Sequence, residues 1–229
     1  IDVKYDLIIL ENNLINVDLM FEDLEKIYVD QINIFGNFIT EEKVIRNSLI
    51  VDEGDPFNQA LLEKSISNIK SRGIFKNVKS NISNAPDDNQ KRIIDIIVEE
   101  SPTGEIFAGA GAGTGGATIT AGVKEKNYLG KGIKLSTNLS ISESQLKGRF
   151  SVVNPNFKNS DRSLNTTLES VSSDTLSTSG FKTSRTGFSI GTGFEQLKDL
   201  FVNLDVSAYY EKLETSSSAS NHKKKQEGD

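Results

Sequence analysis

Hydrophobic and polar residues alternate along most of the second half of the chain. Between residues 133 and 142, Ile133, Leu135 and Leu139 fall on one side, while lysine, serine and asparagine fall on the other. Because successive side chains of a β-strand point to opposite faces, this pattern predicts strands with one apolar and one polar face. The pattern occurs over residues 105–113, 117–124, 133–142, 145–153, 163–172, 188–194 and 200–209.

These seven predicted strands suit a membrane-spanning sheet. A tilted strand crosses a bilayer with about 9 to 11 residues, and each stretch is near that length. Their polar positions are mostly Ser, Asn, Gly and Lys, as expected for the wet interior of a β-barrel. A soluble β-sandwich also alternates, so it stays open as an alternative on pattern alone. We expect a tight connection at 113–116 and a longer polar one over 174–185.

The first half of the chain mixes helical and strand periods. Residues 28–35 read as a strand, and Thr40 stands where the N-cap of a short helix is expected, with Glu41 and Glu42 in its first turn. A second, amphipathic helix is predicted from Leu62 and the apolar residues that follow it at three- and four-residue steps.

Two further strands, 74–82 and 92–99, complete this half of the chain, and the turn-rich stretch 84–89 joins them. The predicted order is β-α-α-β-β. Residues 1–25 hold two more strand-like runs, which resemble the last hairpin of a preceding copy of the same module. We therefore expect three parts, residues 1–25, 26–101 and 102–229, and we interpret the chain as an internal fragment of a longer protein.

Composition removes several classes of chemistry. The chain has no Cys and one His, so thiol nucleophiles and disulfides are excluded, and histidine-dependent catalysis and zinc sites are not expected. The net charge of −6 argues against nucleic acid as a partner. We predict no catalytic residues, no cofactor and no metal. The acidic pairs, such as Glu99 and Glu100, are interpreted as solvated charge, and His222 as part of a polar tail. The glycines from Gly109 onward lack the Lys-Ser/Thr ending of a phosphate loop.

Several short motifs together resemble a known family. Residues 32–37, the run Glu53-Gly54-Asp55-Pro56-Phe57-Asn58 and residues 73–78 look like a POTRA domain. Residues 111–114, 121–132 and 153–157 follow in the order found where such a domain enters a bacterial surface antigen barrel. The chain thus resembles the BamA family of outer-membrane protein assembly factors. The resemblance implies an α+β POTRA domain followed by the N-terminal part of an antiparallel transmembrane β-barrel, with about seven strands present.

The resemblance also implies a function without chemistry. In this family the first barrel strand forms a loose lateral seam and templates incoming strands through backbone hydrogen bonds. Here that strand would carry the predicted gate residues, and residues 75–82 would form an exposed POTRA edge. Residue by residue, the predicted gate is Ile106, Phe107, Ala108, Gly109, Ala110 and Gly111, and the predicted edge is Phe75, Lys76, Asn77, Val78, Lys79 and Ser80.

The implied location is the outer membrane, with the POTRA part in the periplasm. The implied partners are unfolded outer-membrane protein clients, accessory lipoproteins of the assembly complex, periplasmic chaperones and outer-membrane lipid. Two alternatives stay open. One is a POTRA-barrel transporter of the two-partner secretion or translocation-assembly type, and the other is a soluble β-rich binding module.

Overall fold

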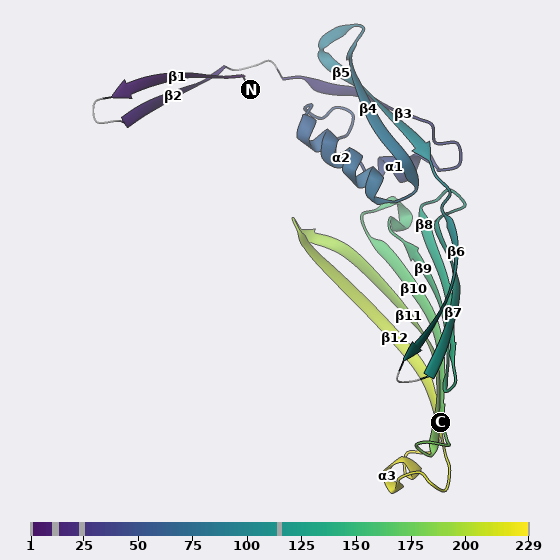
Figure 1. Ribbon diagram of the computed structural model, residues 1–229. Coiled ribbons are helices and arrows are strands. Elements are labelled where there is room, and N and C mark those ends of the chain that lie inside the picture. Colours follow the sequence, from purple (N-terminus) through teal and green to yellow (C-terminus); the bar gives the residue numbers. More distant parts are fainter. Residues whose placement is uncertain (1, 11–13, 23–25, 114–115, 229) are drawn as a thin grey trace.

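The computed structural model describes residues 2–10, 14–22, 26–113 and 116–228, and they form three separate sheets (Figure 1). The first sheet is a hairpin of β1 (Asp2–Leu10) and β2 (Leu14–Glu22), paired antiparallel from Asp2 opposite Glu22 to Leu10 opposite Leu14. Among the described residues, no helix combines the length and the apolarity that a membrane span requires.

The second sheet has three strands in the order β3-β5-β4. The elements are β3 (Tyr28–Phe35), α1 (Glu42–Arg46), α2 (Gln59–Ser71), β4 (Phe75–Ala85) and β5 (Asp88–Glu100). We call these five elements the α+β unit. The predicted order β-α-α-β-β is confirmed. β5 lies in the centre, parallel to β3 and antiparallel to β4.

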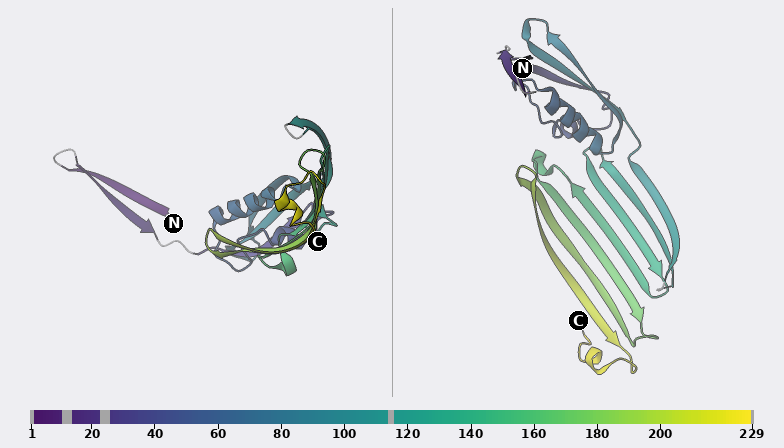
Figure 2. Two further views of the ribbon diagram at one scale, coloured as in Figure 1. Left: turned by 90° about the horizontal axis from the view of Figure 1, so that it is seen from below. Right: turned by 60° about the vertical axis from the view of Figure 1, so that its left-hand side comes forward.

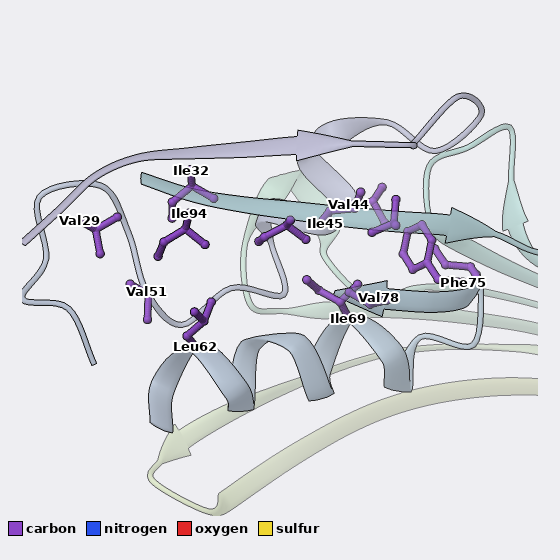
Figure 3. Close-up of a cluster of buried hydrophobic side chains, with 13 residues drawn as sticks. Val29, Ile32, Val44, Ile45, Val51, Leu62, Ile69, Phe75, Val78 and Ile94 are labelled. Atoms are coloured by element: carbon purple, nitrogen blue, oxygen red, sulfur yellow. The ribbon is translucent and has the colours of Figure 1, made fainter. Parts of the chain in front are cut away.

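One hydrophobic core holds the α+β unit together. Thirteen buried side chains lie between the helices and the sheet (Figure 3), and Ile45, Ile69 and Ile94 are fully buried. α2 presents Leu62, Ser65 and Ile69 to this core, at the spacing expected for one face of a helix. The helix starts at Asn58, whose side-chain oxygen accepts the N–H groups of residues 60 and 61.

One local prediction for this unit is confirmed in a narrower form, and one is wrong. The stretch 84–89 joins β4 to β5, but both strands extend into it and leave only residues 86–87 as the turn. Thr40 is not the N-cap of α1, since that position belongs to Glu41 and no side chain caps the helix. The Thr40 hydroxyl instead accepts a hydrogen bond from Asn127, and its N–H donates to Glu100.

The third sheet, which we call the large sheet, has seven antiparallel strands in sequential order from β6 to β12. The predicted number of strands is confirmed, and each strand pairs with its neighbour in the chain. The strands are β6 (Gly104–Gly113), β7 (Gly116–Tyr128), β8 (Ile133–Ser142), β9 (Gln145–Asn154), β10 (Ser163–Thr175), β11 (Phe181–Leu197) and β12 (Leu200–Thr215).

The large sheet also departs from the predicted connections. The polar loop expected over 174–185 shrinks to residues 176–180, because Thr183 to Arg185 continue the ladder with β10. The tail beyond β12 contains a short helix, α3 (Asn221–Lys224), which includes the exposed His222. The predicted tight connection at 113–116 has Thr114 and Gly115 outside the described residues.

The large sheet is curved, and the α+β unit lies at one end of its strands (Figures 1 and 2). Seen along the strands, α2 lies on the concave side of the arc (Figure 2, left). A cavity of about 840 Å³ is lined there by Lys64 and Asn68 of α2 and by Ser163, Gly193 and Asn203 of the large sheet. The register places these sheet residues on the polar face, so the polar face is concave and the apolar face is convex.

Candidate functional site

The first candidate site is the outer edge of β6. β6 ends the large sheet and pairs only with β7 among the described strands, from Gly104 opposite Glu125 to Gly113 opposite Gly116. The six predicted gate residues all lie in this strand. An edge strand presents unpaired backbone N–H and C=O groups, which can pair with another strand. The geometry of β6 therefore allows strand addition in this chain.

Side chains on β6 are nearly absent beyond its base. On the concave face, Phe107 is followed by Gly109, Gly111 and Gly113, and a Cβ added at any of these three glycines would meet nothing within 4 Å. On the convex face, Ile106 is 84% exposed and alanines follow it. No neighbour in the described chain requires these glycines. They leave the backbone of β6 accessible and its outer half without side-chain packing.

The base of β6 is anchored by an aromatic ring. Phe107 lies opposite Gly122 of β7, and a Cβ at Gly122 would be 2.5 Å from the ring. The Lys124 ammonium lies 4.8 Å from the centre of the same ring, within the range of a cation–π interaction. An aromatic side chain over a cross-strand glycine replaces packing that the glycine lacks. β6 is therefore held near the α+β unit and weakly held towards its far end.

The second candidate site is β4, which forms one edge of the three-stranded sheet. All six predicted edge residues lie in β4. Some of them pack into the core, and the others face solvent. Phe75 and Val78 are buried in the core, whereas Lys76 is exposed and its Nζ is 2.8 Å from Glu99. The register shifts between Phe75 and Asn77, which places Lys76 at an irregularity. Lysines and bulges limit unspecific pairing at an edge, so this edge is less open than that of β6.

A polar junction joins the α+β unit to the large sheet. Asn127 is 7% exposed, and its side-chain amide donates to the Thr40 hydroxyl at 2.9 Å. The Asn127 side-chain oxygen accepts the N–H of Gly132 at 2.8 Å, and the Glu41 N–H donates to the Gly130 carbonyl at 2.9 Å. Buried polar groups that all find partners give a rigid, specific contact. The turn after β7 is thus fastened to the start of α1.

Arg72 makes a second connection at this junction. Its guanidinium donates to the Ser48 hydroxyl and, at 2.7 Å, to the side-chain oxygen of Asn156 in the loop after β9. Burial lowers the pKa of the Arg72 guanidinium, because desolvation disfavours its charged form. No pattern in the sequence indicates that Asn127, Arg72 and Asn156 meet across the two units.

Glu100 fixes the loop between β3 and α1. Its carboxylate accepts the backbone N–H groups of Phe38 at 3.1 Å, Ile39 at 3.0 Å and Thr40 at 2.7 Å. Burial opposes its ionisation, but the hydrogen bonds from Thr40, Ile39 and Phe38 outweigh that effect and lower the pKa of Glu100. The interpretation of Glu100 as solvated charge is therefore wrong. The described residues contain no group of three or more His, Cys, Asp or Glu that could hold a metal ion.

Comparisons with known families and proteins agree with this architecture. Residues 27–101 match the POTRA family, described as a surface antigen variable number repeat, and residues 127–229 match the Omp85 superfamily domain. BamA, the outer membrane protein assembly factor of Neisseria meningitidis, is 30% identical over 151 residues, which are 64% of this chain and 19% of that protein. A putative outer membrane protein assembly factor of Treponema pallidum is 30% identical over 53% of this chain and 15% of its own length.

Solved structures share the fold. BamA of Haemophilus ducreyi lacking POTRA domains 1–3 superposes with a TM-score of 0.73 and 21% identity, over 93% of this chain and 41% of that one. CdiB of Acinetobacter baumannii gives a TM-score of 0.55 and 10% identity, over 92% of this chain and 42% of that one. The chain therefore spans 15 to 19% of these curated relatives and less than half of these structures.

Proposed function

We propose that this chain takes part in the assembly of β-barrel proteins into the outer membrane. It is a POTRA-containing member of the Omp85 superfamily. Its large sheet lies in the outer membrane, and its α+β unit, the POTRA domain, lies in the periplasm. The open edge of β6 carries this proposal. Its backbone groups pair with an incoming client strand, and recognition of main chain demands little of the client sequence.

The build of β6 suits a reversible seam. The Phe107 ring keeps the base of the strand on β7, while the glycines and alanines beyond it let the far end change partners at small cost in side-chain packing. Ile106, Phe107, Ala108, Gly109, Ala110 and Gly111 are the proposed pairing residues. No residue of this strand is proposed to act in a chemical step.

Crosslinking in the full-length protein tests this function. We expect a cysteine at Gly109 to form disulfides with cysteines placed along a client's terminal strand, with yields that follow one register. Thr120 is the matched control, because it lies opposite Gly109 on β7, which has strands on both sides. Crosslinks of equal yield at the two positions would contradict strand templating, as would normal client insertion when β6 is locked to the last barrel strand.

For the POTRA domain we propose reception of unfolded clients, periplasmic chaperones and accessory lipoproteins. The edge of β4, from Phe75 to Ser80, supports this role because its outer side has no paired strand among the described residues. A photo-crosslinker at Lys79 should capture such partners, and one at Ile97, opposite Lys79 on the central strand β5, should capture fewer. We also propose that residues 1–25 end a preceding POTRA domain, that 26–101 are one such domain and that 102–229 begin the barrel.

A second candidate function follows from the fold being shared with proteins other than BamA, such as CdiB. It is a POTRA-barrel transporter of the two-partner secretion or translocation-assembly type. Depletion of the full-length protein separates the two candidates. Loss of many unrelated outer-membrane barrels supports assembly, and loss of a single exported partner supports transport.

A further inference from the structure

Four exposed apolar residues lie where the POTRA domain meets the large sheet. Phe38 and Ile39, between β3 and α1, are 94% and 72% exposed, and Tyr128 and Leu129, at the end of β7, are 44% and 68% exposed. We call these four residues the junction patch. Single exposed apolar side chains are common, but a group of large ones at one place marks a contact surface.

The two halves of the junction patch are direct neighbours. A Cβ at Gly130 would lie 2.1 Å from the Ile39 carbonyl oxygen, so the turn after β7 touches the loop that carries Phe38 and Ile39. The hydrogen bond from the Glu41 N–H to the Gly130 carbonyl closes the same contact from the other side of the loop. The patch is therefore one surface, although its halves are about 90 residues apart in sequence.

Both halves are held in place with their side chains outward. The Glu100 carboxylate binds the backbone N–H groups of Phe38 and Ile39, which fixes the loop. Leu129 has a φ of 54°, a left-handed conformation that is disfavoured for residues with a Cβ. In water, neither this backbone conformation nor the exposed apolar side chain of Leu129 is favourable. Transfer of the side chain into an apolar medium would stabilise it.

Tyr128 connects the junction patch to the convex, apolar face of the large sheet. Tyr128 pairs with Ile133, the first residue on the apolar face of β8, and the POTRA domain lies beyond this end of the strands. Lys131, exposed in the same turn, places a cation beside the patch. Of the acidic groups nearby, Glu100 holds the loop, while Glu41 pairs with Lys43 and also interacts with the Lys131 charge.

We propose that the junction patch is a membrane anchor of the POTRA domain. Phe38, Ile39, Tyr128 and Leu129 enter the periplasmic leaflet of the outer membrane, and the Lys131 ammonium lies at the lipid phosphates. The anchor fixes the tilt of the POTRA domain against the bilayer. This inference rests on the large sheet being in the membrane and not on the insertion of clients.

Lipid quenching in the full-length protein tests the anchor. A cysteine at Phe38 is labelled with the fluorophore NBD, in a protein without other cysteines, and reconstituted into vesicles of phosphatidylethanolamine and phosphatidylglycerol. Spin-labelled lipids should lower its emission roughly two-fold or more, because anchors of this kind enter a membrane by about 5 to 10 Å. A label at Leu129 is the second probe, in case the loop tolerates no substitution.

Two further labels make the outcome decisive. Ile82, 40% exposed on β4 towards the hairpin far from the large sheet, should stay unquenched, and Leu139, on the convex face of β8, should be quenched. Emission at 38 and 129 that matches the Ile82 label, with Leu139 quenched, would overturn the anchor and leave the barrel intact. Labels at 38 and 129 shielded by a bound protein and not by lipid would also overturn it. An unquenched Leu139 would overturn the membrane placement itself.

Discussion

The POTRA domain encloses thirteen apolar side chains in one core, whereas the large sheet leaves side chains of the same kind uncovered. Ile45 and Ile94 are fully buried, but Leu168 is 53% exposed and Val206 is 70% exposed. In the POTRA domain, water drives apolar groups together. In the large sheet, backbone hydrogen bonds between strands make the structure, and we propose that lipid covers the apolar face. The two regions thus teach that one chain can be built for two solvents.

The largest expected effect is the loss of stability when a buried side chain of the POTRA core is truncated. Ile45→Ala should destabilise the POTRA domain by about 2 to 5 kcal/mol, because it leaves a cavity in a closed core. Leu168→Ala leaves no cavity and should change POTRA stability by less than about 0.5 kcal/mol. Hydrogen exchange of β3–β5 amides in the full-length protein measures both. Equal effects of the two variants would contradict the conclusion that only the POTRA domain has a closed core.

A charge on each face of β10 sharpens the contrast within the large sheet. Leu168→Arg places a cation on the convex face and should cost about 2 to 4 kcal/mol if it lies near the bilayer midplane. Thr167→Arg places the same charge on the concave face, where water is expected, and should cost little. The fraction of protein that keeps heat-modifiable gel mobility after reconstitution reports the difference. A larger loss for Thr167→Arg than for Leu168→Arg would show that lipid contacts the concave face and not the convex one.

The junction between the regions gives an intermediate effect. Asn127→Ala removes the hydrogen bonds to Thr40 and Gly132 and should cost about 1 to 3 kcal/mol, because their buried partners stay unpaired. The Gly132 amide should then exchange faster. Asn138→Ala, on the wet face of β8, is the control and should leave that amide unchanged. Unaltered exchange in the Asn127 variant would show that the junction is held by other contacts.

The smallest expected effect is the loss of stability when Glu100 is protonated at low pH. The pKa of Glu100 is lowered in the folded protein, so its contribution to stability is present above the ordinary pKa of 4.5 and is lost as pH falls through the lower folded value. The loop with Phe38 and Ile39 should loosen in the same range. Glu100→Gln should loosen it at neutral pH and remove this pH dependence, as amide exchange at Ile39 would show. If amide exchange at Ile39 still rose steeply at low pH in the Glu100→Gln variant, another titrating group would be responsible.

Local patterns predicted what each region buries, and little of how the regions meet. Apolar and polar residues alternate at nearly every position from Ile133 to Ile141, so β8 was predictable from the sequence. The contact of Asn127 with Thr40 spans 87 residues and depends on a turn and a loop that have no shared period. Thr40 looked like an N-cap because a threonine before two glutamates fits the local rule. Its hydroxyl and its N–H instead form hydrogen bonds with the distant Asn127 and Glu100.

The short link between the two regions has a mechanical consequence. Only residues 101–103 separate β5 from β6, and two backbone hydrogen bonds, Ser101 to Ile74 and Lys126 to Thr103, hold them. Three residues reach at most about 11 Å, so the link has no slack with which to absorb a rotation. We therefore expect a rotation of the POTRA domain to move the base of β6, the strand that we propose as the seam.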